Sequence, residues 1–192
     1  MLIKDTDFID LPVFVKGKVR NVYDLGDSLL MVVTDRISAF DVVFDELIPN
    51  KGKVLSSISA FWFDFTKDIL PNHVISTNPE EYPMGLSKYK EELQGRSMLV
   101  KKVKMLPAEC IVRGYLEGSA LKEYNANGTV GGIKMPEGLL QGDKLPSPLF
   151  TPSTKEDTGH DINIPYDQLV DLIGIEDAQA LRDSSLALYT KV

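Results

Sequence analysis

The stretch FVKGKVRNVYDLGDSLLMVVTD, residues 14–35, decides the fold class of this 192-residue chain. Two apolar segments rich in Val and Leu flank the turn-forming sequence DLGDS, which is typical of two strands joined by a tight turn. The first segment gathers three cations around Gly17, in a chain of net charge -7: Lys16, Lys18 and Arg20. The stretch therefore predicts antiparallel strands that carry a local concentration of positive charge.

These cations allow two interpretations. Lysines discourage pairing at a strand edge, so the cluster can be a solvated hairpin edge. Alternatively, Gly17 lets the backbone approach a ligand closely, and the cations suit a polyphosphate. The chain has no G-x-x-x-x-G-K-[ST] sequence, which excludes a Walker A loop. A glycine turn between antiparallel strands is more similar to the phosphate loop of kinases.

Downstream, strand and helix patterns alternate. Apolar residues at helical spacing predict a helix from Lys53, packed by its apolar face and ending before Pro71: Leu55, Ile58, Trp62, Phe65 and Ile69. Strand patterns lie at residues 40–46, 73–78, 97–106 and 108–116. A helix is expected from Ser119 to Gly128, and two more after residue 165. Strands first, then mixed elements and helices, predict an α+β fold.

Composition narrows the class of protein. Hydrophobic residues at 43% and charged residues at 26% are typical of a soluble globular protein, and no apolar run approaches the ~18 residues of a membrane helix. The negative net charge argues against a general nucleic-acid surface. The N-terminus lacks the apolar run of a signal peptide, so we expect a cytoplasmic protein. One cysteine, Cys110, and two histidines do not suit the usual zinc sites, so a hard cation such as Mg²⁺ is the expected metal.

The sequence TDRISAFD places Asp35, Ser38 and Asp41 directly after an apolar strand. Asp and Ser side chains commonly bond their own backbone in turns, so these residues can be turn chemistry alone. Beside a nucleotide, the same loop could bind an amino-acid or carboxylate substrate. Both interpretations remain open from the residues.

The sequence AECIVRGYLEGSA places Arg113 in or at the end of an apolar strand, where a guanidinium needs an anionic partner. That partner is either a carboxylate, Glu109 or Glu117, or a phosphate. The phosphate would be held together with Ser119, because a helix N-terminus offers free N–H groups and the positive end of its dipole.

The Pro-restricted segment FTPSTKEDTGHD, residues 150–161, gathers a lysine, a histidine and three carboxylates. Charged loop residues are usually solvated, and a lone histidine is usually structural. In a chain with two candidate phosphate sites, the same residues are also candidates for catalysis.

Four stretches together resemble the SAICAR synthetase family (phosphoribosylaminoimidazole-succinocarboxamide synthase) of purine biosynthesis. They are KGKVRNVYDLGDSLLMVVTDRISAFDVVF, LPAECIVRGYLEGSALKEY, NGTVGGIKMPEGL and LFTPSTKEDTGHDINI, in family order. The resemblance implies a two-lobed fold related to kinase and ATP-grasp nucleotide sites. Residues 1–106 would form an antiparallel lobe over ATP, and residues 107–192 a second α/β lobe.

The resemblance also implies the site residues. Those matching the glycine loop over the ATP phosphates are Lys16, Gly17, Lys18 and Arg20. Adenine is expected against the hinge segment with Lys102, Lys104 and Leu106, and the ribose near Glu109. Arg113 and Ser119 match the residues that hold the 5′-phosphate of carboxyaminoimidazole ribonucleotide (CAIR). Asp35, Ser38 and Asp41 match the loop near the substrate carboxylates, and Lys155, His160 and Asp161 match the T-K-x-E-x-H-D segment, with catalytic roles.

The implied activity is the ATP-dependent ligation of L-aspartate to CAIR, an acid–amino-acid ligation that gives SAICAR, ADP and phosphate with the help of Mg²⁺. The expected partners are these small molecules, without nucleic acid or membrane, and a homo-oligomer is left open. One alternative is a kinase-like phosphotransferase, disfavoured because H-R-D-x-x-x-x-N and D-F-G are absent from the sequence. Another is a nucleotide-binding module without catalysis.

Two departures from the family pattern bear on activity. Ile162 stands where the family's H-D-E-N-I sequence has glutamate. The family's D-x-K-x-E-F-G element, implied to supply carboxylates for Mg²⁺, does not occur in these 192 residues, so the metal ligands stay unassigned. We therefore expect this chain, taken alone, to bind nucleotide better than it turns over.

Overall fold

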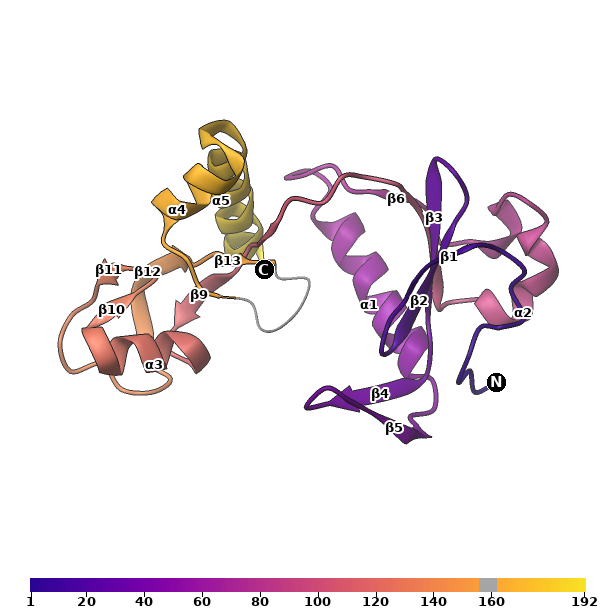
Figure 1. The fold of residues 1–192 in the computed structure, drawn as a ribbon, viewed down its shortest axis with the longest axis horizontal. Helices are drawn as coiled ribbons and strands as arrows, with labels where there is room; N and C mark the ends of the chain where they lie inside the picture. The colour runs from indigo at the N-terminus through magenta and orange to yellow at the C-terminus, as the bar shows by residue number, and fades with distance from the viewer. Residues whose placement is uncertain (156–161) are drawn as a thin grey trace. The chain divides into compact units, whose positions relative to one another are not determined.

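The computed structural model describes residues 1–155 and 162–192, and the chain forms two compact units, Met1–Lys104 and Met105–Val192 (Figure 1). The predicted α+β class is confirmed, because helices are combined with strands that pair in antiparallel fashion in both units. Among the described residues, no helix has the length and apolar character needed to cross a membrane.

Unit 1 is built on a five-stranded sheet with the order β1-β2-β3-β7-β6. Its strands are β1 (Val13–Lys16), β2 (Arg20–Asp24), β3 (Ser28–Val33), β6 (Val74–Ser76) and β7 (Ser97–Lys101). The two strands predicted around DLGDS are β2 and β3, which pair with Tyr23 opposite Leu30. The predicted strand over 97–106 ends at Lys101, before the connection to unit 2.

One face of this sheet carries the core of unit 1. Leu30 and Val32 alternate along β3 and are fully buried, as the two-residue period of a strand requires. Short helices and the N-terminal segment pack against them: η1 (Pro79–Glu81), η2 (Leu86–Tyr89) and α2 (Lys90–Leu93) contribute Tyr82, Leu86 and Leu93, and the N-terminal segment contributes Ile9. Figure 1 shows α2 beside the sheet in unit 1, on the side away from α1.

Helix α1 (Lys51–Phe65) contacts β3. The helix is confirmed, but the expectation that its apolar face is packed is wrong, since Leu55, Ile58, Trp62 and Phe65 are 39–49% exposed. The helix instead meets the sheet through its small residues Gly52 and Ser56, both buried. It also ends before the predicted position, at Phe65, where the Thr66 hydroxyl donates to the carbonyl of Trp62.

The TDRISAFD stretch forms the first strand and the turn of a β-hairpin rather than a loop. Strands β4 (Arg36–Ala39) and β5 (Val42–Leu47) pair with each other, joined at Phe40 and Asp41. Both joining residues have positive φ, 49° and 64°, which is the backbone of a tight two-residue hairpin turn. Phe40 is fully exposed at this turn.

Unit 2 combines short antiparallel strand pairs with three helices in its described residues. Its elements are β8 (Ala108–Glu109), β9 (Val112–Tyr115), α3 (Gly118–Asn127), β10 (Thr129–Val130), β11 (Ile133–Lys134), β12 (Lys144–Phe150), β13 (Ser153–Thr154), α4 (Tyr166–Ile173) and α5 (Ile175–Lys191). The pairs are β9 with β12, β8 with β13 and β10 with β11. As predicted, Gly128 ends α3, with a left-handed φ of 69°.

The hydrophobic residues of unit 2 form two clusters. One lies around α3 and includes Leu116, Ala120 and Val130. The other joins α4 and α5 to the end of β12 and includes Leu169 and Ala178, both fully buried. The strand β9, which carries Arg113, is thereby held between β12 and α5, and this fixes the position of its side chains.

Candidate functional site

Unit 1 contains a cavity of about 540 Å³ on the α1 side of the sheet. Its wall is apolar where the sheet and α1 face each other, and basic where the turn between β1 and β2 closes one end. The lining residues are Val15, Gly17, Lys18, Val19, Arg20, Val22, Met31, Val33, Ser38, Leu55, Ser56, Ser59, Phe63, His73 and Met98. An apolar cavity with a cationic rim suits a ligand that has a flat apolar part and an anionic part.

The turn at the rim is tight because Gly17 donates its N–H to the carbonyl of Arg20 at 2.8 Å. A Cβ atom added to Gly17 would lie only 2.7 Å from that same carbonyl oxygen. A glycine is therefore required by the turn itself, in addition to any ligand above it.

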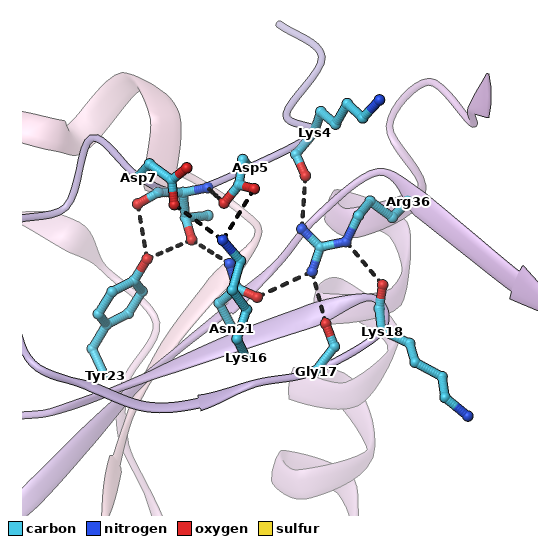
Figure 2. A network of polar contacts seen from close by, with 10 residues as sticks. Lys4, Asp5, Asp7, Lys16, Gly17, Lys18, Asn21, Tyr23 and Arg36 are labelled. Carbon is cyan, nitrogen blue, oxygen red and sulfur yellow. Dashed lines mark hydrogen bonds and ion pairs between the residues drawn. The ribbon is translucent and has the colours of Figure 1, made fainter. Parts of the chain in front are cut away.

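The three predicted cations of the turn do not act together. Lys18 and Arg20 line the cavity, and Lys18 also pairs with Asp41 of the β4–β5 turn. Lys16 instead reaches Asp5 and Asp7 of the N-terminal segment, at 3.3 and 3.2 Å, and is not part of the cavity lining (Figure 2).

The carboxylate of Asp5 shows how Lys16 is held. Burial acts to raise the pKa of Asp5, but hydrogen bonds from the Thr6 N–H and from Lys16 outweigh it, and the pKa lies below its ordinary value. The sequence alone does not distinguish Lys16 from Lys18 and Arg20. Its acidic partners lie in the N-terminal segment, and no local pattern predicts where that segment packs.

Asp35 must be removed from the predicted substrate-binding residues. Its side chain is fully buried and accepts hydrogen bonds from the backbone N–H groups of Ile3 and Gly52, at 2.9 and 3.0 Å. It also forms an ion pair of 3.1 Å with the buried guanidinium of Arg96. Burial alone would raise the pKa of Asp35, yet these donors and the charge of Arg96 hold the pKa below its usual value. Asp35 therefore joins the N-terminal segment, α1 and the turn before β7 as a structural acceptor.

The remaining residues of the predicted unit 1 site are placed as follows. Ser38 lines the cavity. Lys102 reaches Asp24 at 2.7 Å, a contact that lowers the pKa of Asp24, and its ammonium lies over the ring of Phe14. Lys104 is exposed at the end of unit 1. The expected role of Lys102 and Lys104 beside adenine stays a prediction.

His73 lines the cavity and was not singled out from the sequence. Its ring packs edge-on against Phe63, with ring centroids 5.1 Å apart. Burial, followed by the charge of Arg20, lowers the pKa of His73, which favours a neutral imidazole. Only the fold brings His73 to the cavity, since it lies far from the glycine turn in sequence.

In unit 2, the structure brings together Arg113 and Ser119, the two residues expected to hold a phosphate, and that role stays a prediction. The Arg113 guanidinium donates to the hydroxyls of Ser119, at 2.9 Å, and Thr151, at 3.1 Å. The carboxylates weighed as alternative partners are engaged elsewhere: Glu109 pairs with Lys155, and Glu117 accepts from Gly118 and Gln141.

Arg113 borders a cavity of about 250 Å³ in unit 2. Its lining residues are Arg113, Ala120, Glu123, Asn127, Thr129, Val130, Gly131, Gly132, Thr151, Pro152, Asn163, Ile164 and Pro165. A guanidinium oriented by two hydroxyls at the edge of a polar cavity is suited to bind a phosphate or carboxylate group.

Glu123 is a second cavity residue that sequence reasoning missed. Its carboxylate accepts hydrogen bonds from the N–H groups of Gly131 and Gly132 and from the Thr129 hydroxyl, at 2.8–3.0 Å. Burial opposes ionisation, but these donors and the charge of Arg113 lower the pKa of Glu123. Glu123 thus fixes the turn that forms one wall of the cavity. The sequence feature that could have indicated this role is the glycine pair Gly131 and Gly132, which follows the short strand β10 after α3.

The predicted catalytic set is only partly described. Lys155 follows β13, and its ammonium pairs with Glu109 of β8, the strand that pairs with β13. His160 and Asp161 lie outside the described residues. Leu106 is half-buried in unit 2, and its expected contact with adenine stays a prediction, as does that of Glu109 with the ribose.

The expected Mg²⁺ finds no carboxylate cluster in residues 1–155 and 162–192, where no three His, Cys, Asp or Glu side chains are grouped to hold a metal ion. Because Mg²⁺ bound with a nucleotide needs only one or two protein carboxylates beside the phosphates, the expected Mg²⁺ stays a prediction.

The described residues thus form an α+β protein with an apolar, cation-rimmed cavity in unit 1 and a polar cavity bordered by Arg113 in unit 2. A family model described as SAICAR synthetase matches residues 13–192. A phosphoribosylaminoimidazole-succinocarboxamide synthase of Geobacter sulfurreducens is 56% identical over 99% of this chain, and one of Thermodesulfovibrio yellowstonii is 53% identical. This chain belongs to the SAICAR synthetase family.

A solved structure supports the same conclusion. SAICAR-synthase from Saccharomyces cerevisiae, complexed with SAICAR, is 42% identical over 98% of this chain with a TM-score of 0.88. The chain spans 64% of the length of both the yeast protein and the Geobacter protein, and 65% of the Thermodesulfovibrio protein.

Proposed function

We propose that the chain carries out the ATP-dependent ligation of L-aspartate to CAIR, giving SAICAR, ADP and phosphate. One observation carries the proposal: a chain of the SAICAR synthetase family holds both a cavity under a basic glycine turn and an oriented arginine–serine pair at a second cavity. The relatives' names and the SAICAR bound to the yeast protein support the choice of substrates.

The proposed chemistry divides a difficult condensation into two steps. A carboxylate is a poor electrophile, and a protonated amine is no nucleophile. In the first step, the γ-phosphoryl group of ATP passes to the imidazole carboxylate of CAIR, which gives an acyl phosphate and ADP. In the second, the neutral amine of aspartate attacks the acyl carbon, and phosphate leaves as the amide forms.

The described residues supply binding and charge for these steps. In unit 1, the Gly17–Val19 turn with Lys18 and Arg20 would hold the ATP phosphates, and the apolar cavity would take the base. In unit 2, Arg113 and Ser119 would hold the 5′-phosphate of CAIR. Ser38 and Asp41 stay candidates for substrate contact, and Lys155, His160 and Asp161 stay candidates for proton transfer.

Mg²⁺ is the metal proposed to accompany ATP. We also propose that the chain acts in the cytoplasm on small molecules, without nucleic acid or membrane. Sedimentation of the chain at several concentrations tests whether it associates with itself.

The proposal is tested by measuring ADP and SAICAR with ATP and CAIR, in the presence and absence of aspartate. We expect ADP and SAICAR to form in equal amounts and only when all three substrates are present. ADP formation without aspartate, together with a phosphorylated ribonucleotide, would instead support a kinase-like phosphotransferase. Nucleotide binding without product in any mixture would support a binding module.

A further inference from the structure

Arg36 is a buried guanidinium that faces the back of the glycine turn. Its side chain is bound to four neutral oxygens: the carbonyls of Lys4 at 2.7 Å, Lys18 at 2.8 Å and Gly17 at 2.9 Å, and the side-chain amide oxygen of Asn21 at 3.0 Å (Figure 2). The residue is 8% exposed. A buried positive charge destabilises a protein unless its N–H groups are hydrogen-bonded. The burial of Arg36 therefore calls for an explanation.

Two of the four oxygens belong to consecutive peptide groups of the turn. The Gly17 carbonyl shares its peptide plane with the N–H of Lys18, and the Lys18 carbonyl shares its plane with the N–H of Val19. The described chain contains no cis peptide bond. In a trans peptide the C=O and N–H bonds point in opposite directions. Because both carbonyls point toward Arg36, both N–H groups point away from it.

The opposite side of the turn is the cavity side. Lys18 and Val19 line the cavity of about 540 Å³, whereas Arg36 does not. Within residues 1–155 and 162–192, neither the Lys18 N–H nor the Val19 N–H has an acceptor. Two neighbouring N–H groups directed to one side make a concave site for an anion.

The next carbonyl of the turn, that of Val19, is held by Thr34, two residues before Arg36. The Val19 carbonyl accepts hydrogen bonds from the Thr34 N–H at 3.0 Å and from the Thr34 hydroxyl at 2.8 Å. Three successive carbonyls, from Gly17 to Val19, are therefore held by Thr34 and Arg36. The TDR sequence after β3 thus acts as the support of the turn.

We propose that Arg36 is a positioning residue for nucleotide phosphates: it orients the Gly17–Val19 peptides so that the N–H groups of Lys18 and Val19 face the polyphosphate. The inference rests on the proposed binding of ATP in unit 1. Arg36 itself does not touch the nucleotide, and its charge acts through the two carbonyls. A turn held in this way does not need to be ordered when the phosphates bind, which strengthens binding of the phosphate part alone.

The test compares the affinities of the chain for ADP and for adenosine, by calorimetry at a temperature where every variant is folded. Arg36→Met removes all four hydrogen bonds, and Arg36→Lys retains the charge but not the planar fork. We expect Arg36→Met to weaken ADP binding about tenfold, with Arg36→Lys in between, and adenosine binding to change less than about twofold.

Arg96→Lys is the matched control. Arg96 is also a buried arginine of unit 1, but it binds Asp35 and the Val33 carbonyl and contacts no atom of the turn in the described chain. We expect Arg96→Lys to lower the melting temperature while ADP affinity stays unchanged. A purely structural role for Arg36 would produce the same result for both arginines, and that result would overturn the proposal.

A second measurement needs no substitution, in case Arg36→Met does not fold. In ¹⁵N-labelled chain, we expect ADP to shift the backbone amide resonances of Lys18 and Val19 strongly, and adenosine to leave them nearly unchanged. If ADP binds and these two resonances do not move, the inference is wrong and nucleotide binding still stands. If the unaltered chain does not bind ADP at all, the proposed function fails and the inference fails with it.

Discussion

Arg36 in unit 1 and Arg113 in unit 2 show two different uses of the same side chain. Arg36 is buried and bound mostly to main-chain carbonyls, so its charge determines how a turn is shaped. Arg113 is oriented by two hydroxyls and borders a cavity, so its own donors are offered to a ligand. The glycine turn at the rim of the unit 1 cavity is therefore shaped through its backbone, whereas the Arg113 edge of the unit 2 cavity is formed by side chains.

The difference predicts where each unit is sensitive to substitution. A site made by backbone depends on the packing behind it, and a change in that packing affects the stability of the unit. A site made by side chains can lose its ligand contacts while the unit stays folded.

The largest effect is expected for Gly52→Ala in unit 1. A Cβ at Gly52 would lie 2.4 Å from the Val33 carbonyl and 3.0 Å from the Thr34 carbonyl, and backbone atoms cannot move aside individually. We expect the free energy of unfolding of unit 1 to fall by about 3 kcal/mol or more. Urea unfolding followed by the fluorescence of Trp62, the single tryptophan, reports this unit.

Gly114→Ala in unit 2 is the control for that substitution. The nearest atom to its added Cβ is the hydroxyl oxygen of Tyr189, 2.2 Å away, at the far end of a side chain that can rotate. We expect a smaller loss, about 1–2 kcal/mol, measured by unfolding of unit 2. Equal losses of unfolding free energy at the two glycines would mean that the TDR segment behind the glycine turn is no more rigid than the surroundings of Gly114.

The second prediction is that Arg113→Lys weakens binding of the ribonucleotide by about 1.5–3 kcal/mol, because lysine keeps the charge but cannot match the planar fork. ATP affinity and the melting temperature should barely change. Both affinities are measured by calorimetry on the same preparation. A parallel fall in ATP affinity would mean that Arg113 acts through stability rather than through ligand contact.

The third prediction separates the two lysines that flank Gly17. Lys18 lines the cavity, whereas Lys16 is held by Asp5 and Asp7 outside it. Lys18→Met should weaken ADP binding by about 1 kcal/mol at low ionic strength and by less at high salt. Lys16→Met should leave ADP affinity nearly unchanged. Equal effects would show that Lys16 leaves its carboxylates when nucleotide binds.

The fold class and the family could be predicted from the sequence because the informative patterns are local. Short-range periodicity and turn residues predict β2 and β3, the start of α1, and the three helices found in the described part of unit 2. The proximity of Arg113 and Ser119 also follows from local sequence, since six residues across a strand-to-helix turn separate them, while their shared phosphate stays a prediction.

Other features depend on segments that are distant in sequence. Asp35 was expected beside substrate, but its partner Arg96 is 61 residues away, in the turn before β7. The separation of Lys16 from Lys18 depends on how the N-terminal segment docks. The exposed face of α1 has the same helical spacing as a packed face, and periodicity alone cannot show whether a partner surface is present.

The last and smallest effect concerns the pH dependence of unit 2. The hydrogen bonds to Glu123 hold its pKa below the value of 4.5 expected for a free glutamate. As pH falls, the unfolded chain takes up this proton before the folded chain does, so the stabilisation from Glu123 is complete above about pH 4.5 and is lost as pH falls through the folded pKa.

Glu123→Gln should therefore flatten the decline of unit 2 stability below pH 4.5, and it should lower stability at pH 7, because the ionised acceptor is gone. Glu137→Gln, at an exposed position of the same unit, is the matched control and should keep the decline of the unaltered chain. Amide hydrogen exchange in α3 measures both. If the two variants lose stability along the same curve, the turn at Gly131 and Gly132 does not depend on the charge of Glu123, and the unit 2 cavity would then be shaped by backbone in the same way as the turn in unit 1.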